Sequence, residues 1–192
     1  MPTTVLFVQG AGDMHHPEGS IHLARWLERE LGDDFRVLAP EMPEAENPGY
    51  ERWRGAIEKE LAAIEGPVLI VGHSLGASTV LKMLSQSSAP PRLRGLFLVS
   101  TPWWEPEGWS AEYAVAEGFP DRLPDIPIFL YHSVDDREVP FSHLDTYRNG
   151  LPAATARAIP GREHSFVHGL PELGADIRSV AAVLAPTSEP RT

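Results

Sequence analysis

The chain has 192 residues, of which 42% are apolar and 22% charged, and its formal net charge at pH 7 is −11. This composition is typical of a globular protein that can close one sizeable core. The acidic balance argues against nucleic acid or an anionic membrane as a partner. The absence of cysteine excludes disulfides, thiolate metal sites and a cysteine nucleophile.

The beginning of the chain, MPTTVLFVQG, lacks the basic segment and long apolar stretch that are typical of a signal peptide. No run approaches the roughly 18 apolar residues that a membrane span requires. We therefore expect a soluble cytoplasmic protein.

Short apolar runs alternate with longer segments of helical period along the chain. Strands are predicted at Val5–Val8, Phe35–Leu38, Val68–Val71, Leu96–Val99, Ile128–Tyr131 and Thr155–Ile159. Helices are predicted at Ile21–Leu31, Tyr50–Ile64, Leu75–Leu84, Ser142–Leu151 and Leu173–Leu184. One further short helix is expected in the loop-rich stretch from Ser100 to Asp125.

This alternation predicts an α/β fold, a mostly parallel sheet with helices on both faces. Runs such as VLIV and LFLV fit strands that are buried on both sides. We expect one domain over residues 1–185 and a frayed tail over 186–192. Ligands bind such sheets at the carboxyl ends of the strands.

The segment Gly72-His73-Ser74-Leu75-Gly76 fits the pattern G-x-S-x-G between a predicted strand and a predicted helix. A serine on so tight a turn projects its hydroxyl into the cleft, and glycines are required where side chains would collide with backbone. The alternative is a glycine-rich turn with a helix-capping serine. The context favours Ser74 as a nucleophile.

A nucleophilic serine needs a base, and the base needs an acid that orients it. The expected chain order is serine, acid, histidine. The segment IFLYHSVDDREVP offers Asp135 or Asp136 after a strand, and IPGREHSF offers His164 after the next strand, with His168 as the reserve choice.

The other histidines fit these roles less well. His73 is too close in sequence to reach Ser74 and is expected to pack or hydrogen-bond locally. His22 and His143 lie in predicted helices and are expected to be ordinary surface residues. His132 lies at the end of a predicted strand, where we expect it to contact the catalytic residues from behind.

Two backbone amides are expected to stabilise the oxyanion. One is that of Leu75, directly after the nucleophile, and the other comes from the loop QGAGD, where Ala11 is preferred and Gly12 is the alternative.

Adjacent His15 and His16, with Asp13 and Glu18 nearby, lack the spacing of a metal site, so no metal is expected. Trp103, Trp104 and Trp109 form either part of the core or a substrate-binding wall of the cleft.

With strand-GHSLG-helix, HSVDDREVP and GREHSF in this order, the chain resembles the α/β-hydrolase family over nearly its whole length. It is most similar to the small serine hydrolases without a large cap, the group of the retinoblastoma-binding serine hydrolase. The resemblance implies a minimal lid, Ser74 as nucleophile, His164 as base and Asp136, three residues before Val139-Pro140, as acid.

From the motifs and the resemblance we expect a serine esterase that needs no cofactor and cleaves short- to medium-chain carboxylic esters through an acyl-enzyme. The alternatives are a thioesterase, amidase or acyltransferase on the same triad, or a catalytically silent binding protein with this fold. A fold alone does not decide between them.

Overall fold

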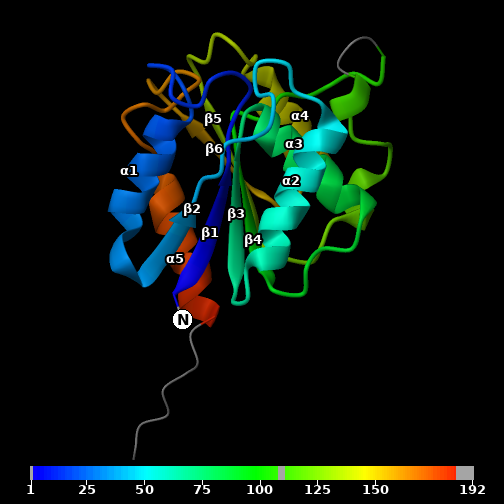
Figure 1. Cartoon of the computed structure of the whole chain (residues 1–192). Helices are drawn as coiled ribbons and strands as arrows, with labels where there is room; N and C mark the ends of the chain where they lie inside the picture. The colour runs from blue at the N-terminus through cyan, green and yellow to red at the C-terminus, as the bar shows by residue number, and fades with distance from the viewer. Residues whose placement is uncertain (1, 108–110, 185–192) are drawn as a thin grey trace, which may run out of the picture.

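The structure is a computed structural model that describes residues 2–107 and 111–184 (Figure 1). Its strands are β1 (Thr3–Val8), β2 (Phe35–Leu38), β3 (Val68–His73), β4 (Leu93–Val99), β5 (Ile128–Ser133) and β6 (Thr155–Ile159). Its α-helices are α1 (Ile21–Leu31), α2 (Tyr50–Ala63), α3 (Leu75–Gln86), α4 (Ser142–Gly150) and α5 (Pro171–Leu184). All the predicted strands and helices are present, with ends shifted by up to three residues.

The expectation of one short helix between β4 and β5 is wrong. The described part of this stretch holds two 3₁₀ helices, Ala111–Tyr113 and Phe119–Arg122. The amide of Ala114 bonds the carbonyl of Ala111, and that of Leu123 bonds the carbonyl of Pro120. Frequent prolines in this stretch confine the helical hydrogen bonds to single turns.

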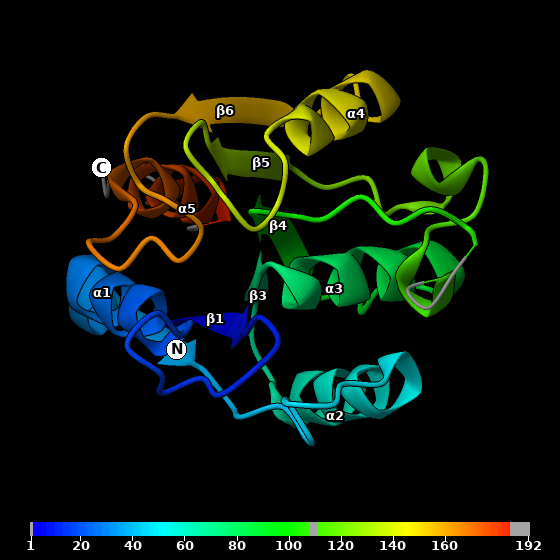
Figure 2. The ribbon, with the colours of Figure 1, turned by 90° about the horizontal axis from the view of Figure 1, so that it is seen from above.

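The six strands form one sheet in the order β2-β1-β3-β4-β5-β6, and every neighbouring pair is parallel. Helices α1 and α5 cover one face, and α2, α3 and α4 cover the other (Figure 2). The α/β fold class, with a parallel sheet between two helical layers, is therefore confirmed.

Each face of the sheet has its own core. On the α2–α3 side, Trp53, Ile57 and Leu81 pack against Leu6 and Ile70 with no exposed surface. On the α1–α5 side, the fully buried residues include Leu23, Leu27, Phe7, Phe97 and Ile177. The central strands are buried on both sides, which explains why they are continuous apolar runs in the sequence.

Because all strands are parallel, their carboxyl ends lie at one edge of the sheet, at the top of Figure 1. The loops after β1, β3, β5 and β6 therefore meet there, and they carry the residues that the motifs single out. None of the helices in the described ranges is long and apolar enough to cross a membrane.

Candidate active site

Ser74 lies on the tight turn between β3 and α3, with φ at 51° and ψ at −122°. A positive φ is unfavourable for a residue with a Cβ, so the surrounding contacts must hold this turn in place. A Cβ on Gly76 would lie 2.2 Å from the Gln9 carbonyl oxygen, and one on Gly72 would lie 2.6 Å from Ala77 Cα. Only glycine fits on either side of Ser74, as the motif predicts.

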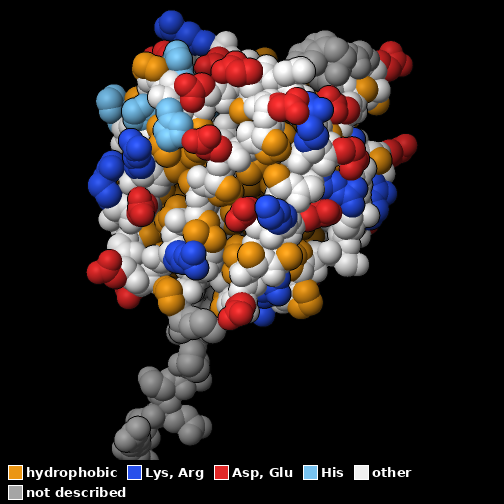
Figure 3. All heavy atoms as spheres, in the orientation of Figure 1, with side chains coloured by type: hydrophobic (Ala, Val, Ile, Leu, Met, Phe, Trp, Pro, Cys, Tyr) orange, Lys and Arg blue, Asp and Glu red, His pale blue; other side chains and the backbone are white. Residues whose placement is uncertain are grey.

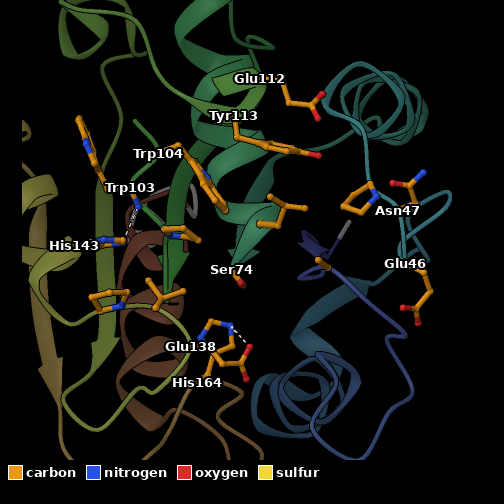
Figure 4. Close-up of a pocket in the computed structure, with 16 residues that line it drawn as sticks. Glu46, Asn47, Ser74, Trp103, Trp104, Glu112, Tyr113, Glu138, His143 and His164 are labelled. Atoms are coloured by element: carbon orange, nitrogen blue, oxygen red, sulfur yellow. Dashed lines mark hydrogen bonds and ion pairs between the residues drawn. The ribbon is translucent and has the colours of Figure 1, made fainter. Parts of the chain in front are cut away.

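Ser74 lines a cavity of about 680 Å³ at the carboxyl edge of the sheet (Figure 4). His164 lines the same cavity, and its ring lies next to the Ser74 side chain in Figure 4. The other polar lining residues are Glu46, Asn47, Glu112, Glu138 and His143, and the aromatic ones are Trp103, Trp104 and Tyr113.

Behind the His164 ring lies Asp136, whose side chain is fully buried. The distance from His164 Nδ1 to Asp136 Oδ2 is 2.9 Å. A carboxylate accepts hydrogen bonds, so the neutral ring carries its proton on Nδ1 and leaves the lone pair of Nε2 toward the cavity.

The Asp136 carboxylate is surrounded by hydrogen-bond donors. Its Oδ1 accepts the amides of Glu138 and Val139, each at 2.9 Å. His132 Nε2 lies 3.3 Å from Oδ2 and 3.0 Å from the Val139 carbonyl oxygen, so it donates to both. Burial opposes ionisation, but the bonds from His132, His164 and the Val139 amide outweigh it and hold the pKa of Asp136 well below its usual range.

The carboxylate of Asp135, the other candidate acid, bonds other groups than His164. Its Oδ1 accepts the Ser133 hydroxyl and the amides of Arg162 and Glu163, each amide at 3.2 Å. The hydrogen bond from Ser133 is the main cause that lowers the pKa of Asp135. Asp135 therefore ties the loop before His164 to the end of β5. The alternative base, His168, is exposed and does not line the cavity.

The loop after β1 brings a second set of amides beside Ser74. The Gly10 amide donates to Ser20 Oγ at 2.9 Å, and the Gly12 amide donates to the Ala45 carbonyl at 2.7 Å. Ala11 lies between Gly10 and Gly12 in the sequence and lines the cavity. Leu75, the first residue of α3, lines the same cavity. The first amides of a helix lack intrahelical acceptors.

His73 is buried and packs on the His164 ring, with ring centroids 5.1 Å apart, but its hydrogen bonds reach distant segments of the chain. Its Nε2 lies 3.0 Å from the His164 carbonyl oxygen, and its Nδ1 lies 2.8 Å from Ser20 Oγ. The carbonyl can only accept, so Nε2 donates and Nδ1 accepts the Ser20 hydroxyl, which itself accepts the Gly10 amide. One buried ring thus connects the loop after β1 with the loop that carries His164.

Of the three tryptophans, the structure places two beside the cavity. Trp103 packs on Tyr147, with ring centroids 5.2 Å apart, and on Phe119 at 6.3 Å. Trp104 packs on Tyr113 at 5.7 Å, and both tryptophans also contact the core. Trp103 and Trp104 therefore line the cavity and pack against the core at the same time. Trp109 lies outside the described residues.

Three cavity residues were not expected from the sequence. His143 is not an ordinary surface residue, because its Nδ1 accepts the Trp103 amide at 3.0 Å and it is half-buried in the wall. Glu138 Oε2 lies 3.7 Å from His164 Nε2. Tyr113 closes the wall beside Trp104. No motif marks these residues, because loops from distant parts of the sequence bring them together.

Histidine side chains gather near the upper end of α1 on the face shown in Figure 3. His15 Nε2 forms a 2.8 Å hydrogen bond with Glu41 Oε1, and His16 Nδ1 accepts the Glu18 amide. Within the ranges 2–107 and 111–184, no three His, Asp or Glu side chains are placed to hold a metal ion.

A family model described as Serine hydrolase matches residues 7–161. The ydeN gene product of B. subtilis matches at a TM-score of 0.74 and 20% identity, over 95% of this chain and 100% of that chain. A YdeN-like hydrolase from Pectobacterium atrosepticum matches at 0.68 and 19%, over 96% and 94%. Est1E from Butyrivibrio proteoclasticus, with ferulic acid bound, matches at 0.67 and 14%, over 95% and 89%. Comparison with the curated proteins gives no match.

Proposed function

The chain belongs to the serine hydrolase family, and from that premise we propose that it cleaves short- to medium-chain carboxylic esters through an acyl-enzyme intermediate. The observation that carries this proposal is the 2.9 Å contact between His164 Nδ1 and Asp136 Oδ2, in a cavity that His164 shares with Ser74. A serine, a histidine and an ionised aspartate in this relation are the parts that acyl transfer requires.

In the first half of the reaction, the Ser74 oxygen attacks the ester carbonyl carbon while His164 Nε2 takes the hydroxyl proton. The Asp136 carboxylate stabilises the imidazolium that forms. The Leu75 and Ala11 amides donate to the oxyanion. Leu75 directly follows Ser74, Ala11 lines the same cavity, and the amides of Gly10 and Gly12 already have acceptors. The carbon–oxygen bond then breaks, and the leaving alcohol takes the proton from His164.

In the second half, a water molecule gives a proton to His164 Nε2 and its oxygen attacks the acyl carbon. The bond between the acyl carbon and the Ser74 oxygen then breaks, the acid leaves, and Ser74 takes the proton back from His164. Every step uses groups of this chain, and the proposed reaction needs no cofactor or metal. The strained backbone at Ser74 holds the nucleophile on the turn beside the cavity. This turn requires Gly72 and Gly76, because a Cβ at either position would collide with backbone.

The cavity supports the choice of substrate. Its wall of Trp103, Trp104 and Tyr113 gives an acyl chain apolar surface on which to bind. The described part of the stretch between β4 and β5 forms only short 3₁₀ helices around it, which fits a small lid. We therefore propose acyl groups of short to medium length rather than long lipid chains.

Hydrolysis of thioesters or amides, and acyl transfer, would use the same three residues. A binding protein without catalytic activity could also retain these residues. A screen of para-nitrophenyl esters of increasing acyl length, with the matching thioester and anilide, separates these functions. We expect turnover of the short and medium esters that Ser74→Ala abolishes. Preferred turnover of the thioester or the anilide would contradict the ester assignment, and no turnover of any substrate would favour the binding protein.

A further inference from the structure

The Tyr113 hydroxyl is buried at the cavity without a hydrogen-bond partner. Tyr113 is 2% exposed, and within the part of the chain that the structure describes no group donates to or accepts from its hydroxyl. A buried polar group without a partner costs free energy, and folded proteins contain few of them. A hydroxyl kept in this state beside a binding cavity is a candidate contact for a ligand.

The surroundings fix the Tyr113 ring and give its hydroxyl a direction. The ring packs against Trp104 at 5.7 Å and edge-to-face against Tyr50 at 6.4 Å. The neighbouring Glu112 carboxylate accepts the Tyr50 amide at 3.0 Å and makes no hydrogen bond with the Tyr113 hydroxyl. In Figure 4 the hydroxyl points across the cavity toward the segment that carries Asn47.

The position of Tyr113 relative to the reacting groups indicates which part of a substrate it meets. In Figure 4, Ser74 lies between His164 and Tyr113. The leaving oxygen must lie near His164, which gives it a proton, so the acyl chain extends away from His164 toward Trp104 and Tyr113. The far end of the acyl chain therefore reaches the Tyr113 side of the cavity.

We propose that Tyr113 forms a distal acyl subsite whose hydroxyl donates a hydrogen bond to an oxygen in the substrate's acyl chain. The substrate class is then esters of acids that carry an ether, carbonyl or hydroxyl oxygen some distance from the ester group. Burial raises the pKa of Tyr113 to about 12, so the phenol remains a donor at neutral pH. This inference rests on the proposed ester hydrolysis at Ser74.

The test uses pairs of para-nitrophenyl esters of equal chain length, in which one methylene of the acyl chain is replaced by an ether oxygen at successive positions. For each pair, the ratio of kcat/KM for the ether ester to that for the alkyl ester is measured in the wild type and in Tyr113→Phe. Comparing the two proteins cancels any intrinsic difference in reactivity between the esters. At one ether position we expect Tyr113→Phe to lower this ratio by about fivefold or more, because one hydrogen bond is lost.

Tyr147→Phe is the matched control. Tyr147 is also buried, at 3% exposed, but its hydroxyl donates to the Pro102 carbonyl at 2.8 Å and does not belong to the cavity wall. Removing that hydroxyl breaks an existing bond, so we expect a lower Tm and an unchanged ester ratio. Tyr113→Phe removes a hydroxyl that has no partner, so we expect a changed ratio without a fall in Tm.

Equal ratios in wild type and Tyr113→Phe at every ether position, with both esters hydrolysed, would overturn the subsite and leave the proposed function intact. A fall in Tm of Tyr113→Phe as large as that of Tyr147→Phe would also overturn it, because the hydroxyl would then have a partner in the free protein. A wild-type protein that hydrolyses neither ester would overturn the proposed function and the subsite together.

Discussion

His164 Nδ1 and Asp136 Oδ2 lie 2.9 Å apart although the two residues are 28 positions apart in the sequence. The contact is possible because β5 and β6 are parallel neighbours that end at the same edge of the sheet. It fixes the ring so that Nε2 faces the cavity, where Glu138 Oε2 lies 3.7 Å away, and this is the orientation that the proposed base for Ser74 requires.

Replacing Asp136 by asparagine should lower kcat by roughly 10⁴-fold. The Glu138 and Val139 amides and His132 Nε2 already donate toward this side chain, so an amide group there cannot satisfy them and also accept from His164. Steady-state kinetics on a para-nitrophenyl ester measure the loss.

Asp135→Asn is the control for this change, because Asp135 holds the loop before His164 and does not contact the ring. We expect a much smaller loss of kcat. If Asp135→Asn proved the more damaging of the two, the acid would be misassigned.

Gly76→Ala should abolish activity or prevent folding, because the added Cβ would lie 2.2 Å from the Gln9 carbonyl oxygen and push Ser74 away from the loop after β1. Gly55→Ala is the matched control. Gly55 lies in α2 with open space around its Cα, so alanine there should stabilise the protein by about 0.5–1 kcal/mol. Thermal unfolding and ester hydrolysis measure both variants, and an active Gly76→Ala protein would contradict the close approach.

Replacing Trp103 should mainly lower the stability of the protein, whereas replacing Trp104 should mainly change its preference for acyl-chain length. Trp103 packs on Tyr147 and Phe119, so Trp103→Ala should destabilise the protein by about 3 kcal/mol. Trp104→Ala should mainly lower the ratio of kcat/KM for butyryl over acetyl esters, because each buried methylene contributes about 0.8 kcal/mol to binding. An unchanged ratio with a large fall in Tm in Trp104→Ala would show that Trp104 belongs to the core alone.

The stability of the fold should depend on pH through His73. Burial lowers the pKa of His73 to about 3, whereas an unfolded histidine titrates near 6.5. The unfolded chain therefore binds more protons between these values, so the free energy of unfolding rises with pH across this window. The stabilisation is fully present above about pH 6.5 and is lost as the pH falls toward 3.

Urea unfolding between roughly pH 4 and pH 7 tests this prediction. His73→Gln should flatten the rise of the unfolding free energy with pH, whereas His168→Gln, at an exposed position, should keep the wild-type slope. Equal slopes in wild type and His73→Gln would show that another group controls the acid sensitivity.

The sequence predicts most of the fold and the tight turn that carries Ser74, because these depend on local patterns. Apolar runs mark strands buried on both faces, and the glycines around Ser74 mark a turn that only glycine permits. The motif of the resembled family, rather than geometry, distinguishes Asp136 from Asp135. The sequence also predicts the strand Thr155–Ile159, although Ile159 is its one buried residue.

The remaining features depend on contacts between distant segments. His73 bonds Ser20, which precedes it by 53 residues, and His143 accepts the amide of Trp103 from 40 residues away. No pattern of period two or 3.6 records such pairs. The burial of the Tyr113 hydroxyl likewise cannot be predicted from local sequence, because it depends on how the stretch after β4 folds over α3.

The central claim is that Ser74 is the nucleophile and His164 its base. A fluorophosphonate probe followed by mass spectrometry of the intact protein and its peptides tests both at once. We predict one adduct per chain, located on Ser74, absent in Ser74→Ala, formed at the wild-type rate in His168→Gln, and slowed roughly a thousandfold or more in His164→Gln. An adduct on another residue, or labelling of His164→Gln at the wild-type rate, would contradict the account.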